Sequence, residues 1–192
     1  ISCSLVGSEM CIRDRAGVEV AFVGPDNFAA AYEVGKLLGK KLRNEDKVAI
    51  IEGLAVADNA RQRKRGFIKA IEEKGLRLVA SEPADWETEK AAEVFQAMWM
   101  RYPDLKAVYC SNDAMALGVL QQMQEKKCYL PVVGFDNDAV MKEFLSTGKL
   151  VATADIFSSQ MAVRGIEFAL DVLEGRIENR GVHSTAYEII KQ

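Results

Sequence analysis

Polar and aromatic side chains follow four apolar stretches of this 192-residue sequence, each at the point where a strand is expected to end. Asp58 and Arg61 follow the first stretch, Trp86 the second, Asn112 the third and Asp136 the fourth. A guanidinium, an amide and carboxylates can hydrogen-bond to hydroxyl groups, and a large ring can cover an apolar C–H face. The set therefore predicts a binding surface for a neutral, polyhydroxylated ligand such as a sugar.

Each of these residues also has an ordinary structural interpretation. Asp58, Ser111 and Asp136 are favoured helix N-caps, and Arg61 could belong to the solvated basic cluster RQRKR. Trp86 could simply cover an edge of the core. We favour binding because the four kinds of group are expected along one edge of a sheet.

The run AVYCSNDAMALGVL (107–120) passes directly from a strand pattern to a helix pattern. Its three polar residues, Ser111, Asn112 and Asp113, either cap the helix or contribute a residue to a ligand site. We expect Ser111 or Asp113 to begin the helix, which leaves Asn112 to face the ligand.

No pattern of catalytic or cofactor-binding residues accompanies this set. The single histidine is His183, so a Ser-His-Asp triad or a histidine-rich metal site would depend on that residue alone. The sequence holds no GxxxxGK or GxGxxG phosphate loop, and its four cysteines form no CxxC pair. We therefore predict binding without chemistry: no enzyme activity, no cofactor and no metal.

The composition limits the partners. Lys and Arg total 25 and Asp and Glu total 28, and the net charge of −3 disfavours a nucleic acid or an anionic membrane surface. No apolar run approaches the roughly 18 residues of a membrane span, so no direct membrane insertion is expected. Residues 1–15 have no regular period and resemble translated sequencing-adapter read-through, a foreign leader that we exclude from the fold.

Short apolar runs alternate with longer amphipathic segments from residue 18 onward, which predicts parallel strands joined by crossover helices. The fold class is therefore α/β, a doubly wound parallel sheet whose ligands bind beyond the carboxyl ends of the strands. Strands are expected at 18–23, 47–52, 76–80, 106–110, 130–135, 150–155 and 186–190, and helices at 27–42, 59–75, 88–104 and 158–175.

Five motifs in order, ARQRKRGF, ASEPADW, AVYCSNDAMALGVL, VVGFDND and STGKLVATAD, resemble the ribose-binding branch of the periplasmic sugar-binding proteins. That family comprises the type I solute-binding components of ABC transporters. The resemblance covers residues 18–192 and implies two lobes that close on a monosaccharide, a membrane permease as partner and a periplasmic location. It also implies truncation at the N-terminus, where a signal peptide would have been lost.

The resemblance divides the chain into five parts. They are the leader 1–15, the last strand of the N-terminal lobe with a hinge crossing 16–25, the C-terminal ligand-binding lobe 26–155, a helix of the N-terminal lobe 156–180, and a final crossing with the C-terminal strand 181–192. Truncation predicts that the remaining half of the site binds sugar weakly. It also predicts few packing partners for one face of the helix at 158–175, formed by Met161, Ile166, Ala169, Leu170 and Leu173.

In the family the residues matching Arg61, Asn112 and Asp136 hydrogen-bond to the sugar, and an aromatic residue in the place of Trp86 stacks on it. A glutamine is common where this chain has Ile156, and an apolar side chain at this position cannot hydrogen-bond to a sugar hydroxyl. Asp155 beside it either supplies a hydrogen bond to the sugar in place of the glutamine or faces away from the sugar. Asp58, Asp155 and Ile156 are therefore additional candidates for sugar-binding or hinge residues.

Three other functions share parts of this pattern. The effector-binding domain of a lactose-repressor-family regulator has the same fold and the VVGFD motif, but STGKLVATAD resembles the transporter proteins more. A sugar-sensing module of a membrane receptor is a further alternative. A flavodoxin-like enzyme would need a phosphate-binding turn, and GLAVADNAR is poor in glycine and hydroxyl groups at suitable spacing.

Overall fold

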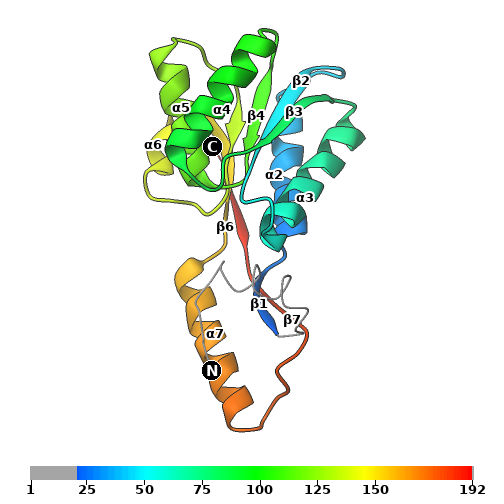
Figure 1. Cartoon of the computed structure of the whole chain (residues 1–192), viewed down its shortest axis with the longest axis vertical. Helices are drawn as coiled ribbons and strands as arrows, with labels where there is room; N and C mark the ends of the chain where they lie inside the picture. Colours follow the sequence, from blue (N-terminus) through cyan, green and yellow to red (C-terminus); the bar gives the residue numbers. More distant parts are fainter. Residues whose placement is uncertain (1–20, 192) are drawn as a thin grey trace.

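The structure, a computed structural model, describes residues 21–191. Its larger part, which we call the body, is built on a six-stranded sheet in the order β3-β2-β4-β5-β6-β8 (Figure 1). All pairs are parallel except β6 with β8, which is antiparallel. The strands are β2 (Lys47–Glu52), β3 (Arg77–Pro83), β4 (Ala107–Cys110), β5 (Val132–Val133), β6 (Leu150–Asp155) and β8 (Glu188–Lys191).

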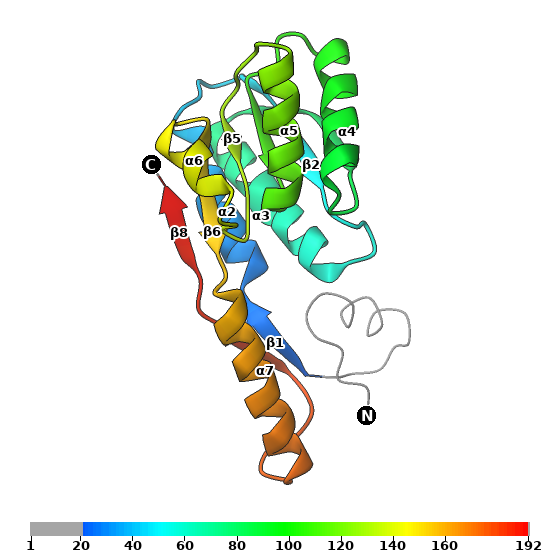
Figure 2. The same ribbon diagram turned by 90° about the vertical axis from the view of Figure 1, so that its left-hand side faces the viewer.

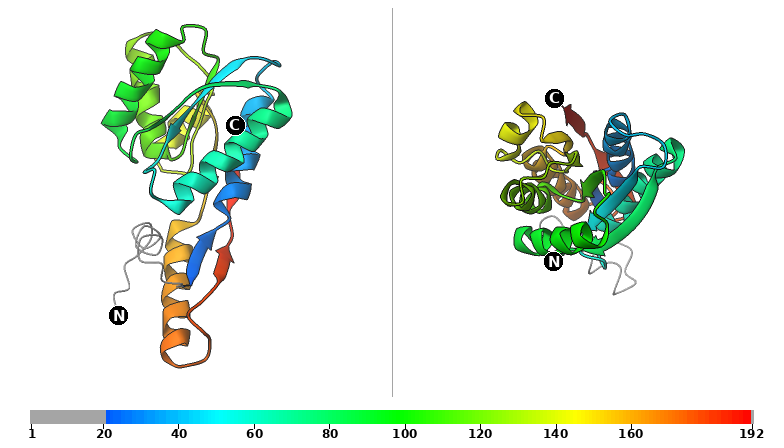
Figure 3. Two further views of the ribbon diagram at one scale, coloured as in Figure 1. Left: turned by 45° about the vertical axis from the view of Figure 1, so that its right-hand side comes forward. Right: turned by 90° about the horizontal axis from the view of Figure 1, so that it is seen from above.

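Helices cover both faces of this sheet, which confirms the predicted α/β class (Figure 3). Consecutive residues of β2 point to opposite faces: Val48 and Ile50 pack with α2 and α3, whereas Ala49 and Ile51 pack with α4 and α5. Such a strand is apolar along its whole length because both its faces are buried. The helices of the body are α2 (Asn27–Gly39), α3 (Asp58–Lys74), α4 (Thr88–Arg101), α5 (Asp113–Glu125) and α6 (Met141–Ser146).

The helix ends follow the local chemistry, although α2 and α4 each end three residues before the predicted limits of 42 and 104. Helix α3 stops at Gly75, whose φ of 70° is the left-handed conformation that glycine adopts at little cost. Helix α4 ends two residues before Pro103, which cannot continue a helix. Asp26 caps α2 by accepting a hydrogen bond from the Ala29 amide.

A smaller part, which we call the lower unit, extends from the body (Figure 2). It consists of the parallel strands β1 (Phe22–Pro25) and β7 (Val182–Thr185) and the helix α7 (Ser158–Leu173). Ile166, Leu170 and Leu173 of α7 are at least half exposed, as predicted. Met161 differs from the prediction because it is buried against Ile156 in the core of the body.

Several predicted boundaries were wrong, for physical reasons. The strand predicted at 76–80 continues to Pro83, because β3 stays paired with β2 although its last residues are not apolar. Strand β7 was not predicted, since its sequence VHST is polar and exposed. The leader 1–15 and the start of the strand predicted at 18–23 lie outside the described residues.

Among residues 21–191, no helix has the length and apolar character needed to cross a membrane.

Candidate functional site

Arg63 is the centre of the site that the structure supports best. Its side chain is 6% exposed, and its guanidinium donates from Nε to Asn27 Oδ1 (2.9 Å) and from a terminal nitrogen to the Ser111 carbonyl (2.7 Å). The same terminal nitrogen lies 3.4 Å from Asp136 Oδ1. The guanidinium carbon lies 3.7 Å from the centre of the Phe135 ring. A buried cation held on several sides keeps a fixed orientation, which suits it to recognise a ligand.

The sequence analysis chose Arg61 for this role. The side chain of Arg61 is 45% exposed, and its described hydrogen bonds go to the Val56 carbonyl (3.0 Å), just before α3, and to Asp58 (3.2 Å), the first residue of α3. The contacts with Asp136 and Trp86 belong to Arg63 instead.

Helical periodicity could have revealed this difference. Arg63 lies three residues after Ala60 and four before Phe67, on the buried face of α3, whereas Arg61 falls on the outer face.

Trp86 lies beside this guanidinium, 5.5 Å from its carbon to the ring centre. The ring rests on Gly53 at the end of β2: a Cβ added to Gly53 would lie 2.2 Å from Cη2 of Trp86. Both Asp85 and Trp86 have positive φ, 52° and 71°, a conformation that costs energy in residues other than glycine. The loop after β3 thus presents a half-buried ring at the edge of the sheet, in a strained backbone.

Asp136, in the loop after β5, is the anionic group of the site. Its side chain is 25% exposed, and its Oδ1 is buried without a hydrogen-bond donor among the described residues. Burial raises the pKa of Asp136 to about 6, although the nearby Arg63 opposes the rise. Oδ1 faces the Arg63 guanidinium, so it is the exposed part of this carboxylate that can accept a hydrogen bond from a hydroxyl group.

Asn112 follows β4 and is the N-cap of α5, which begins at Asp113, one of the two residues predicted to begin it. Oδ1 of Asn112 accepts a hydrogen bond from the Met115 amide (2.9 Å). The cap occupies only the oxygen, so the Nδ2 group keeps its donor capacity. Ser111 instead supplies its carbonyl to Arg63, and its hydroxyl is buried without a partner among the described residues.

The three additional candidates have roles within the chain. Asp58 accepts hydrogen bonds from Arg61 and Gln62 in its own helix. Asp155 accepts from Asn137 Nδ2 (2.8 Å) and from the Phe157 amide (2.7 Å), where the chain leaves the body. Ile156 is 6% exposed and packs in the core next to this crossing.

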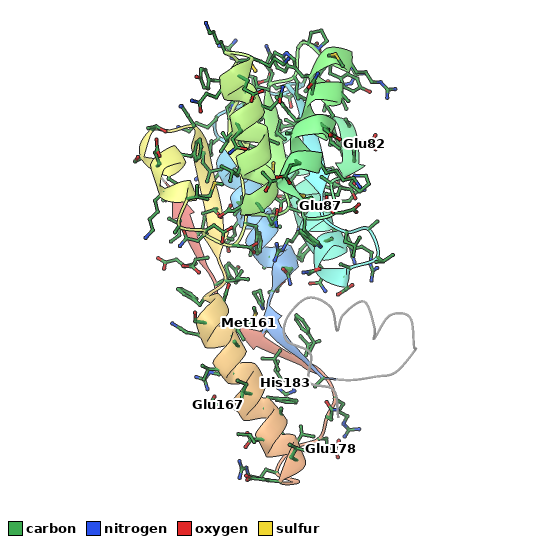
Figure 4. All side chains as sticks on the ribbon, turned by 60° about the vertical axis from the view of Figure 1, so that its left-hand side comes forward. Glu82, Glu87, Met161, Glu167, Glu178 and His183 are labelled. Atoms are coloured by element: carbon green, nitrogen blue, oxygen red, sulfur yellow. The ribbon has the colours of Figure 1, made fainter. Side chains whose placement is uncertain are left out.

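A cavity of about 450 Å³ lies elsewhere, between α7 and the strands β1 and β7. Of the predicted site residues, it is lined only by Ile156. Met161 and His183 border it from facing elements, as Figure 4 shows. Among its charged lining residues, Arg164 pairs with Glu167 along α7 at 3.3 Å, and Asp171 pairs with Arg176. Their charges are matched by exposed partners, so the edge of the body is the better candidate site.

The edge of the body at the carboxyl ends of its parallel strands thus carries a ring, a fixed guanidinium, an amide and a carboxylate. These groups suit a ligand with several hydroxyls and an apolar face. Among the described residues, no group of three or more His, Cys, Asp and Glu side chains is placed to hold a metal ion.

Comparison with known families agrees with this class of site. A family model described as periplasmic binding protein domain matches residues 13–177. The chain belongs to the periplasmic binding protein family, as its motifs predicted. This family, the parallel sheet and the polar groups at its edge define a solute-binding fold.

Two curated relatives are similar to this chain over most of its length. The D-ribose/D-allose-binding protein of Pseudomonas aeruginosa is 40% identical over 178 residues, which are 90% of this chain and 56% of the relative. The ribose import binding protein of Escherichia coli is 34% identical over 83% of this chain and 54% of its own length. The chain therefore spans about half the length of the curated relatives it matches.

Solved structures of solute-binding proteins have a similar fold. An ABC transporter solute-binding protein from Burkholderia multivorans superposes with a TM-score of 0.87 at 35% identity, over 94% of this chain and 64% of that one. A periplasmic solute-binding protein from Actinobacillus succinogenes, solved with bound D-allose, gives a TM-score of 0.83 at 30% identity, over 93% of this chain and 64% of that one.

Proposed function

We propose that the body of this chain forms one wall of a monosaccharide-binding site, in the solute-binding component of an ABC transporter. The observation that carries the proposal is the buried guanidinium of Arg63, held beside Trp86 and Asp136 at the edge of the sheet. The relatives that bind ribose or allose support a pentose or hexose of that type as the ligand.

Each group has a distinct role in this proposal. Trp86 covers the apolar face of the sugar ring, and Asp136 accepts hydrogen bonds from its hydroxyls. Arg63 donates to a ring or hydroxyl oxygen, and Asn112 donates through Nδ2. Asn27 holds the Arg63 guanidinium through Nε and thereby fixes its direction.

The setting of this binding is also part of the proposal. The sugar is bound without chemical change and passed to a membrane permease, in the periplasm or an equivalent compartment outside the cytoplasm. The family and the import proteins among the relatives support this setting over a repressor or a receptor module.

A fluorescence titration tests the proposal. The chain has two tryptophans, so Trp99→Phe leaves Trp86 as the only indole. We expect D-ribose or D-allose to change its emission with a Kd on the order of 1 mM, weak because a site open on one side leaves water to compete. The matched control is Trp86→Phe, which keeps Trp99 in α4 and should show no change. Emission of the Trp99→Phe chain that stays constant at sugar concentrations well above this Kd would contradict the proposal.

A further inference from the structure

The loop that carries Asp136 has an unfavourable backbone conformation. Asp136 and Asn137 have φ values of 109° and 59°, in a region that residues with a side chain rarely occupy. Such a conformation persists only when the surrounding structure holds it. The direction of the Asp136 side chain therefore depends on whatever holds this loop.

Three successive amides of the loop point into the body. The Asp136 amide donates to the Ala154 carbonyl (2.7 Å), and the Asn137 amide donates to Thr153 Oγ1 (3.3 Å). The Asp138 amide donates to Asp113 Oδ2 (2.9 Å). Two of these acceptors, the Thr153 hydroxyl and the Asp113 carboxyl group, are side chains of the body, so the loop is held partly by side chains.

Asp113 and Thr153 form one buried unit. Neither side chain is exposed, and the Thr153 hydroxyl donates to Asp113 Oδ1 (2.9 Å). A Cβ added to Gly134 would lie 2.0 Å from this oxygen, so the carboxylate is seated directly against the backbone of the chain. Burial raises the pKa of Asp113 to about 7, and the hydrogen bonds from Asp138 and Thr153 limit that rise.

Asp113 also connects two parts of the candidate site. It follows Asn112, the cap of α5, and its own amide donates to the Phe135 carbonyl (2.7 Å). Through its backbone and its side chain, Asp113 therefore joins the start of α5 to both ends of the segment that contains Asp136.

We propose that Asp113 and Thr153 are positioning residues, which hold the loop 136–138 so that Asp136 and Asn112 point toward the same ligand. This inference rests on the proposed function, because it takes Asp136 and Asn112 as sugar contacts. Neither Asp113 nor Thr153 touches the sugar, since both are enclosed within the body.

The test compares two substitutions in the ¹⁵N-labelled chain. Thr153→Val keeps the shape but removes the hydroxyl, and Thr153→Ser keeps the hydroxyl but removes the methyl group. In Thr153→Val we expect hydrogen exchange of the Asn137 and Asp138 amides to become at least about tenfold faster, with exchange in β2 unchanged. The affinity for D-ribose or D-allose should fall about fivefold, as for one lost hydrogen bond. Thr153→Ser should stay within about twofold of the wild type in both measurements.

The outcomes separate the two proposals. Exchange at Asn137 and Asp138 that is unchanged in Thr153→Val would overturn the positioning role, as would faster exchange with unaltered affinity. Exchange that accelerates equally throughout the sheet would show a merely structural role and would also overturn it. A wild-type chain that gives no response to either sugar would overturn the proposed function, and the exchange result would still decide whether the pair holds the loop. If Thr153→Val does not fold, Asp113→Asn replaces it, with the same two loop amides as the readout.

Discussion

The body and the lower unit differ in how completely their apolar side chains are covered. In the body, every strand from β2 to β6 except the edge strand β3 is buried over most of its length, with helices on both faces. In the lower unit, α7 carries one buried residue, Met161, while Leu170 and Leu173 are 50% and 62% exposed. The candidate site lies on the body, at the edge formed by the ends of its strands.

In the function that we propose, the densely packed body is the part that orients the ligand. A buried guanidinium such as that of Arg63 needs hydrogen-bond and ionic partners around it, because a buried cation without partners is costly. The lower unit offers no such surroundings to Arg164 or His183, which are both exposed. Four predictions test this comparison, in order of decreasing effect.

The largest effect is expected in the core of the body. Phe67 is fully buried and stacks on Tyr109 with ring centres 4.3 Å apart. Phe67→Ala should lower the free energy of unfolding by about 3–5 kcal/mol, because it removes the ring and leaves a cavity. Leu170→Ala in α7 is the control, and it should cost less than about 1 kcal/mol because half of the side chain is already in water. Urea denaturation measures both, and equal losses would contradict the comparison.

The second prediction compares the two arginines of α3. Arg63→Lys should weaken sugar binding about thirtyfold, or about 2 kcal/mol, because a lysine cannot reproduce the several directed hydrogen bonds of the guanidinium. Arg61→Lys should change the affinity by less than about twofold, since Arg61 is on the exposed face of the helix. Calorimetric titration of both variants decides between them. A greater loss for Arg61→Lys would restore the residue that the motif first suggested.

The third prediction concerns the ring and the carboxylate. Trp86→Ala and Asp136→Ala should each weaken sugar affinity about tenfold or more, which corresponds to about 1.4 kcal/mol. Gly53→Ala should have a similar effect without touching the sugar, because its Cβ would displace the Trp86 ring. The matched control is Gly165→Ala in α7, where a Cβ meets no atom within 4 Å. If both tryptophan and aspartate variants bind as the wild type does, their proposed roles are removed.

The fourth and smallest effect is a pH dependence. Asp136 has a pKa of about 6 in the folded chain, above its ordinary value of 3.8, so it takes up a proton as the pH falls from 7.5 to 5. Sugar affinity should then decrease about threefold, because the protonated group loses its charge.

Stability should move in the opposite direction. A carboxyl group whose pKa is higher in the folded than in the unfolded chain binds protons more tightly when folded. Its contribution to the unfolding free energy therefore rises as the pH falls from about 7 to about 4. Asp136→Asn is the control, and it should remove its share of both trends. An affinity that increases on acidification would contradict the assignment of Asp136 as an acceptor.

The sequence predicted the fold well because strands that are buried on both faces are apolar along their whole length. Runs such as KVAIIE are apolar throughout, and Gly75 and Pro103 mark helix ends by their backbone chemistry alone. The polar strand β7 left no such trace, because its pairing with β1 depends on backbone hydrogen bonds between distant segments.

The candidate site that we propose was anticipated only in part. The rule that ligands bind beyond the carboxyl ends of strands suggested Trp86 and Asp136, and the structure places both beside Arg63. Arg63 was missed because a motif of alternating arginines does not show which one faces inward, although the helical period of α3 contains that information. The pairing of Asp113 with Thr153 joins residues 40 positions apart and could be found only from the fold.

The most direct test of the central claim is a map of sugar contacts on the ¹⁵N-labelled chain. D-allose should perturb the signals of the Trp86 indole N–H, the Asn112 side-chain amide and Arg63 Nε, and leave those of Arg164 and His183 unchanged. Perturbations confined to the cavity between α7 and β7, or none at the edge of the body, would contradict the account.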